Sequence, residues 1–121
     1  MCLLMRSLAV LALLLLPPVL AGAGEAFLTA IEDVPLAPGL AEQATGGMVF
    51  DSPMGRIVEA VANGTVPADE ISHFYTQTLP QLGWNDAGKM TFKRDNETLR
   101  ISVEPAQKGV VTVRFNLTPH P

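Results

Sequence analysis

The chain has 121 residues, of which 48% are hydrophobic and 17% are charged. That balance supports one folded core and excludes wholesale disorder, while the length excludes an enzyme of two domains with a cleft between them. A formal net charge of −4 disfavours general nucleic-acid binding, which requires a basic surface.

Residues 1–23 have the pattern of a cleavable secretory signal peptide. Arg6 precedes an uncharged apolar run over 7–16, and small residues follow as far as Ala23. We predict cleavage after Ala23, with cleavage after Ala26 as the alternative, and a product that is periplasmic or secreted. The apolar stretch is shorter than the roughly 20 residues that a membrane span needs, so no span is expected in the mature form.

The only cysteine, Cys2, lies in this signal segment. The mature chain is therefore predicted to contain no disulfide, no thiol nucleophile and no thiolate metal ligand. An exported domain of this size without disulfides must depend on its hydrophobic core alone.

Charge is divided unevenly along the chain. Residues 24–88 hold nine acidic side chains and one basic one, whereas residues 89–121 hold six basic side chains and three acidic ones. The C-terminal part is thus basic within an acidic protein, and such an asymmetry indicates a local binding surface rather than a property of the whole chain.

Residues 24–47 are rich in proline, glycine and alanine and are predicted to form an N-terminal arm that lies on the domain. Within it, residues 34–39 (VPLAPG) indicate an extended chain followed by a turn. The small domain is expected over 48–118, and residues 119–121 form a tail.

Two strands and a helix are predicted first. Residues 47–51 are a short strand candidate, and residues 56–62, apolar on both faces, indicate an inner strand. Residues 67–82 predict one amphipathic helix, in which Pro80 distorts the last turn, Gly83 stops the helix and Trp84 returns to the core. The apolar face of this helix consists of Ile71, Phe74, Tyr75, Thr78, Leu79 and Leu82.

Three strands follow over 89–94, 98–104 and 110–117, each alternating apolar and polar residues with a period of two. The predicted class is therefore α+β: a single antiparallel sheet of about five strands in the order ββαβββ, with one amphipathic helix packed on one face and the arm in front.

Three segments together resemble a known group of proteins: 34–39 (VPLAPG), 50–57 (FDSPMGRI) and 74–84 (FYTQTLPQLGW). They resemble small exported proteins of alphaproteobacteria that carry a Pro-Gly arm and an FY…LP…LGW helix end, and the similarity spans roughly residues 33–117. The resemblance implies a location in the bacterial envelope and a single-domain fold, and it implies no activity or cofactor.

With a bacterial source, the Asn-x-Thr sequons at Asn63, Asn96 and Asn116 are interpreted as chance occurrences rather than glycan acceptors.

Few residues suit catalysis. His73 is the one histidine of the presumed domain, and adjacent Ser72 points about 100° away on a helix, so no Ser-His pair is expected. The acids are scattered over several elements without metal-ligand spacing, and no glycine-rich phosphate loop is present. We predict no enzyme, no metal, no cofactor and no pocket of useful size.

The most promising surface is the side of the C-terminal strands that faces away from the helix. It is predicted to be basic and rich in hydroxyl groups and to bind an anionic envelope protein or ligand. The ordinary alternative is a solvated outer face. The predicted binding residues are Lys89, Thr91, Lys93, Arg100, Ser102, Thr112, Arg114 and Asn116.

Three hypotheses follow for function. The first is a non-enzymatic interaction module of the bacterial cell envelope that binds through this face or a sheet edge. The second is a secreted inhibitor or accessory subunit of an envelope enzyme, whose arm over 34–39 inserts into a groove as extended chain. The third is a small hydrolase or lyase that uses His73 and an acid.

Overall fold

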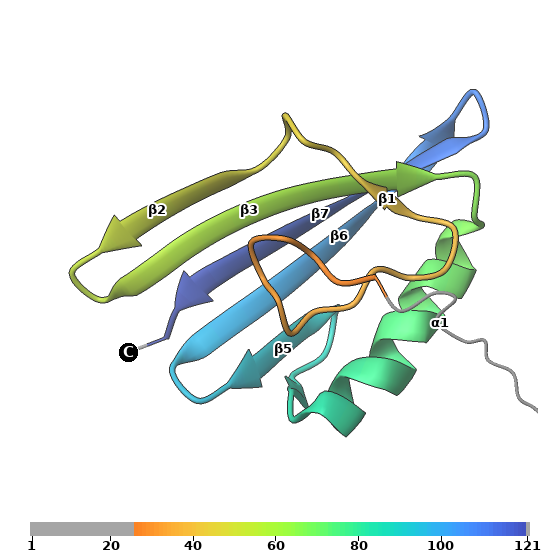
Figure 1. Ribbon diagram of the computed structural model, residues 1–121. Helices are drawn as coiled ribbons and strands as arrows, with labels where there is room; N and C mark the ends of the chain where they lie inside the picture. Colours follow the sequence, from red (N-terminus) through yellow and green to blue (C-terminus); the bar gives the residue numbers. More distant parts are fainter. Residues whose placement is uncertain (1–25, 121) are drawn as a thin grey trace, which may run out of the picture.

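A computed structural model describes residues 26–120 (Figure 1). The predicted signal peptide over 1–23 lies outside the described residues, as do residues 24, 25 and 121. One antiparallel sheet and a single α-helix make up the described chain, so the predicted α+β class is confirmed.

The sheet has seven strands. Its order is β1-β3-β7-β6-β5-β4, and β2 pairs with β3 along the same side as β1, because β7 occupies the other side. The strands are β1 (Ala41–Glu42), β2 (Met48–Ser52), β3 (Gly55–Gly64), β4 (Asn85–Asp86), β5 (Thr91–Arg94), β6 (Glu97–Gln107) and β7 (Val110–Pro119).

Two strands exceed the predicted count of about five. Both β1 and β4 are only two residues long, so neither contains a period that sequence reasoning can detect. The first lies within the predicted arm and pairs with β3, whereas the second pairs with β5. The predicted inner strand, β3, does have a neighbour on each side.

The helix α1 (Ala68–Thr78) continues as a 3₁₀ turn over Leu79–Leu82. Pro80 lacks the backbone N–H that a further α-helical turn would use, which accounts for the tighter winding. Gly83 adopts a left-handed conformation with φ of 96°, and Trp84 returns to the core with 1% of its surface exposed, as predicted. The prediction for Leu82 is wrong: it is 40% exposed, since the 3₁₀ turn rotates it off the apolar face.

The inner face of the sheet carries the core. Pairing brings alternate apolar residues of the three longest strands into rows across this face. These rows contain Val58, Ala60 and Ala62 of β3, Leu117, Phe115 and Val113 of β7, and Leu99, Ile101 and Val103 of β6.

Both α1 and the arm cover this one face, and Figure 1 shows the arm beside the helix on the same side of the sheet. The arm contributes six buried apolar residues to the core: Leu28, Ile31, Val34, Leu36, Ala37 and Leu40. It also approaches β3 closely, because a Cβ on Gly64 would collide with the carbonyl oxygen of Gly39. The opposite face of the sheet, which we call the outer face, is not covered by α1, and the end of the arm reaches it at Val61, whose side chain lies against Gly46.

Candidate interaction surface

The outer face brings together seven of the eight residues predicted to bind. Phe92, Leu99 and Phe115 are buried on the inner face, so their neighbours along each strand point outward. The seven are Thr91, Lys93, Arg100, Ser102, Thr112, Arg114 and Asn116.

Lys89 does not belong to this set. It lies before β5 in a turn, where its φ is 54°, and β5 begins only at Thr91. Gly88, Lys89 and Met90 all have positive φ, and the carbonyl oxygen of Met90 accepts a 2.9 Å hydrogen bond from the backbone N–H of Ile101. This local left-handed backbone removes Lys89 from the regular alternation that the sequence predicted.

The centre of the outer face is a row that crosses five strands. Arg100 lies directly opposite Thr91 on one side and Asn116 on the other, and Asn116 is followed by Glu59 and then Met48. Arg100 and Glu59 lie two strands apart, and no ion pair joins their side chains among residues 26–120. Arg100 is exposed and has uncharged hydrogen-bonding neighbours on both sides.

The outer face is less basic than the sequence indicated. The guanidinium Nε of Arg114 donates to Glu104 Oε2, an ion pair across the β6–β7 hairpin. Two acids, Glu59 and Glu104, thus share the face with three basic residues. Of the three basic residues on the outer face, Lys93 and Arg100 have no ion-pair partner among residues 26–120. They are the groups of this face that remain to attract an anion.

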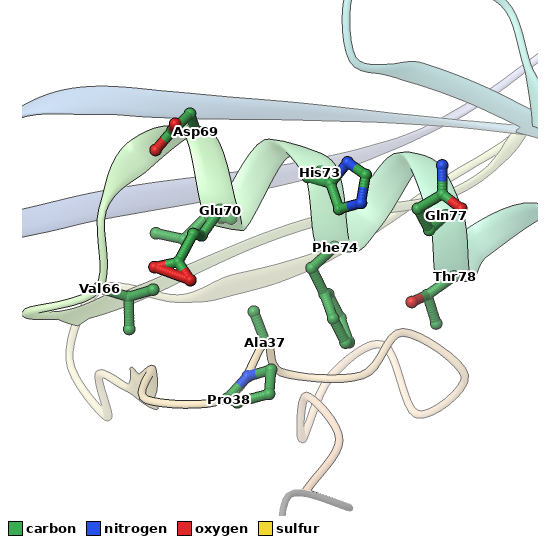
Figure 2. A pocket seen from close by; sticks show the side chains of 10 residues that line it. Ala37, Pro38, Val66, Asp69, Glu70, His73, Phe74, Gln77 and Thr78 are labelled. Atoms are coloured by element: carbon green, nitrogen blue, oxygen red, sulfur yellow. The ribbon is translucent and has the colours of Figure 1, made fainter.

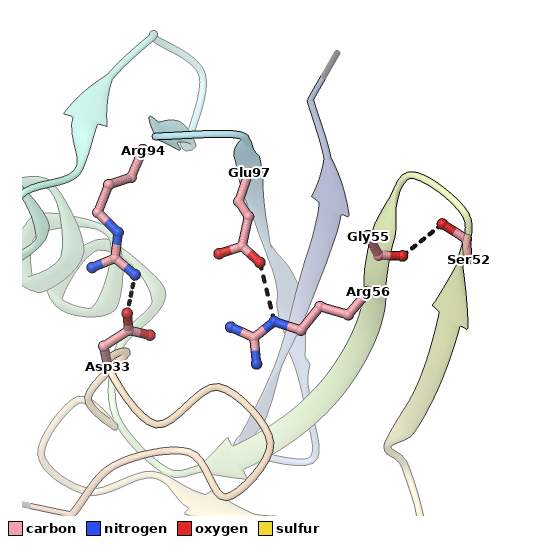
Figure 3. A network of polar contacts seen from close by, with 6 residues as sticks. All are labelled: Asp33, Ser52, Gly55, Arg56, Arg94 and Glu97. Atoms are coloured by element: carbon pink, nitrogen blue, oxygen red, sulfur yellow. Dashed lines mark hydrogen bonds and ion pairs between the residues drawn. The ribbon is translucent and has the colours of Figure 1, made fainter.

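Two other arginines, Arg94 and Arg56, form ion pairs with residues of other elements (Figure 3). Arg94 on β5 pairs with Asp33 of the arm and lies over the ring of Trp84, with 4.2 Å between guanidinium carbon and ring centre. Arg56 on β3 donates a 3.0 Å hydrogen bond to Glu97 on β6, and so spans the intervening strand β7. These cations link elements and are not part of the outer face.

The sequence analysis did not predict that the edge strand β2 exposes apolar side chains. Met48, Val49 and Phe50 are 50%, 61% and 56% exposed. Met48 and Phe50 lie opposite Glu59 and Ile57 and therefore extend the outer face, whereas Val49 points to the other side. A short uncharged run predicts a strand but does not predict whether it is buried, so only the sheet order reveals this exposed edge.

A groove lies between α1 and the arm and has a volume of about 690 Å³ (Figure 2). The sequence predicted no pocket of useful size and did not indicate this groove. Phe74 points from the helix toward Ala37 and Pro38 of the arm, whereas His73 and Gln77 project from the helix on the side away from it. The sequence could not reveal this groove because its second wall is the arm, whose path depends on tertiary packing.

The lining of this groove contains one histidine, His73, and two carboxylates, Asp69 and Glu70. Thr78 supplies the only side-chain hydroxyl, and no serine or cysteine is present. The hydroxyl of Thr76 donates to the backbone carbonyl of His73, but no hydrogen bond joins the His73 imidazole to Asp69 or to any other side chain of the described residues. The groove therefore lacks the linked nucleophile and base that acyl transfer requires.

Residues 26–120 contain neither a cluster of metal ligands nor a helix that could span a membrane. In this range no group of three or more His, Cys, Asp or Glu side chains converges as metal ligands. Neither of the described helical segments has the length and apolar character to cross a membrane.

No protein-family model matches the chain, and neither a curated protein nor a solved structure shows significant similarity to it.

Proposed function

We propose that this protein is an exported, non-enzymatic interaction module of the bacterial cell envelope, which binds an anionic component through the outer face of its sheet. The signal pattern over 1–23 and the resemblance to small exported alphaproteobacterial proteins support the location. The binding surface is the set of seven residues that share the outer face, with Lys93 and Arg100 as its charged members.

The observation that carries this proposal is the position of Arg100. It lies exposed in the middle of a row of strands that α1 does not cover, between Thr91 and Asn116. A guanidinium donates paired hydrogen bonds to a carboxylate or phosphate, and adjacent hydroxyl and amide groups add further contacts. On an acidic protein this arrangement concentrates positive potential in one place.

The chemistry of the groove supports a binding role over an enzymatic one. Its lining contains His73, the carboxylates Asp69 and Glu70, and the hydroxyl of Thr78, but no hydrogen bond joins the His73 side chain to any of the other three. The residues that a small hydrolase or lyase would use are therefore present there but not linked. We therefore keep the hydrolase or lyase as the weakest of the three hypotheses.

The test is a crosslinked pull-down from the cell envelope with the tagged full chain, read by mass spectrometry. The variant carries Lys93→Glu and Arg100→Glu, and the matched control carries Lys108→Glu in the β6–β7 turn. We expect one stoichiometric partner that the control retains and the double variant loses, with circular dichroism unchanged. Equal capture by the double variant and the control would refute binding through the outer face.

A further inference from the structure

The outer side of β2 is an open sheet edge. This strand pairs with β3 on one side, and no strand of the described chain pairs with it on the other. Alternate backbone N–H and C=O groups along that side therefore have no partner strand. The same five residues expose Met48, Val49 and Phe50 by half or more.

The opposite edge of the sheet is protected in the usual way. It ends in β4, which has only two residues, followed by a turn in which Gly88, Lys89 and Met90 adopt positive φ. Short edge strands and irregular backbone discourage pairing with another chain. By contrast, β2 contains no lysine, no proline and no irregularity of register, and its one charge is Asp51.

We propose that β2 is a homodimer interface, in which it pairs antiparallel with β2 of a second copy about a two-fold axis at Val49. The two sheets then form one sheet of fourteen strands, twice the seven of one copy. The proposal goes beyond the proposed function and does not depend on the anionic partner.

The sequence of β2 is self-complementary in this register. Val49 lies opposite Val49 of the second copy, and Met48 lies opposite Phe50 on both sides of the axis, so every large apolar residue meets another. Shifting the axis to Phe50 would instead place Val49 opposite Asp51 and Met48 opposite Ser52. The register at Val49 is therefore the one that buries the exposed apolar side chains.

Charge also favours a second copy at this edge. With the axis at Val49, Asp51 lies opposite Gly47, and the two aspartates are four residues apart, about 13 Å. This separation exceeds the screening length at physiological ionic strength, so their repulsion is small. The one charge of β2 is the acidic Asp51, whereas the cations Lys93 and Arg100 that would attract an anion lie on β5 and β6, so the two surfaces suit different partners.

Dimerisation at β2 has a consequence for binding. The two-fold axis of an antiparallel pair stands perpendicular to the sheet, so both outer faces lie on the same side of the joined sheet. Two copies of the surface containing Arg100 are thereby presented together, which raises the effective affinity for a component with repeated anionic groups.

Sedimentation over a range of protein concentrations gives the first test. Because only Met48, Val49 and Phe50 of β2 find a partner in β2 of the second copy, the interface is small, and we expect a dimer with a dissociation constant on the order of 10 µM. Phe50→Lys places a charge where two apolar side chains meet, and we expect it to raise that constant at least tenfold. The matched control is Val110→Lys, at an apolar residue 38% exposed beside the distant β6–β7 turn.

Single cysteines test the register. In a Cys2→Ser background, Val49→Cys lies opposite itself across the axis, so a short bismaleimide should crosslink it efficiently. Val110→Cys is the control and should crosslink no faster than free monomers collide.

Three results would overturn the proposed dimer: a monomer up to about 200 µM, a dimer that Phe50→Lys leaves intact, or a Val49→Cys variant that crosslinks no faster than Val110→Cys. The proposed function is read separately, because the pull-down with the Lys93 and Arg100 variant does not depend on the oligomeric state.

Discussion

The hydroxyl of Tyr75 on α1 donates a hydrogen bond of 2.7 Å to the backbone carbonyl of Pro35 in the arm. The same oxygen accepts a hydrogen bond of 3.1 Å from the N–H of Ala37. The ring of Tyr75 is fully buried and packs edge-on against Phe115 of β7, with 5.6 Å between ring centres. One side chain thus joins helix, sheet and arm, and it satisfies two arm backbone groups that water does not reach.

Tyr75→Phe should lower the free energy of unfolding by about 1 to 3 kcal/mol, because it leaves a buried carbonyl and a buried N–H without a partner. Urea titration measures this as a lower midpoint with an unchanged slope. Thr76→Ala, on the same helix, is the control and should stay within about 0.5 kcal/mol of the parent. An unchanged midpoint for Tyr75→Phe would show that the arm needs no such anchor.

Alkaline pH should lower the free energy of unfolding through ionisation of the Tyr75 hydroxyl. Burial raises the pKa of the Tyr75 hydroxyl above its ordinary value, partly opposed by the hydrogen bond from Ala37. The folded state therefore keeps a proton that the unfolded chain begins to lose near pH 10. The resulting stability is fully present below about pH 10 and is lost as the pH rises toward the folded pKa, at up to about 1.4 kcal/mol per pH unit.

The readout for this pH effect is the stability difference between the parent and Tyr75→Phe, because pH effects that do not involve the Tyr75 hydroxyl are common to both proteins and cancel. We expect the difference to shrink between about pH 9 and about pH 11. A difference that stays constant over that interval would contradict the assignment to Tyr75.

The elements that sequence predicted correctly are those with local causes. Pro80, Gly83 and Trp84 act within a few residues of the helix end, and the three C-terminal strands alternate over their own length. The left-handed conformation of the turn residues Lys89 and Met90 was not predicted, because nothing in their side chains requires it. Their conformation is set by the β4–β5 connection as a whole.

The features of the outer face likewise divide into those set by local sequence, which could be predicted, and those set by tertiary structure, which could not. Alternation alone placed Arg100 and six neighbours on one face, since the period of a strand is a local property. The pairing of Arg114 with Glu104 depends on the register of the β6–β7 hairpin, and the exposure of Phe50 depends on which strand lies at the edge. Neither register nor strand order can be read from one strand's own sequence.

Arg94 should stabilise the junction between arm and helix end. Arg94→Met keeps much of the aliphatic length but removes the ion pair with Asp33, whose Oδ1 is already buried without a hydrogen bond, and the contact with the Trp84 ring. We expect a loss of about 2 kcal/mol, larger than for an exposed ion pair, because the Arg94 side chain is 23% exposed against 53% for Arg114 and also gives up its contact with the Trp84 ring.

Arg114→Met is the matched control for Arg94→Met, because it breaks the more exposed pair with Glu104, and it should cost less than about 1 kcal/mol. Equal losses in the two variants, measured by urea unfolding, would argue against a special role for Arg94.

Deletion of residues 25–40 separates a structural arm from a binding arm. Six buried apolar side chains of the core leave with it. Five of these are larger than alanine, and at about 1.5 to 3 kcal/mol each their burial is worth on the order of 10 kcal/mol. This equals the whole stability of a typical domain, so the shortened chain should show no cooperative unfolding transition.

Loss of the unfolding transition in the shortened chain would count against the hypothesis that the protein is an inhibitor that inserts its arm. Val34 and Leu36 are buried in the core, so insertion of residues 34–39 into another protein's groove would require them to leave it. Pro38→Ala, at an exposed arm position, is the control and should unfold like the parent. A shortened chain that still unfolds cooperatively would mean that the arm is dispensable for folding, and extended-chain insertion into a partner would then be the better account of why the protein carries it.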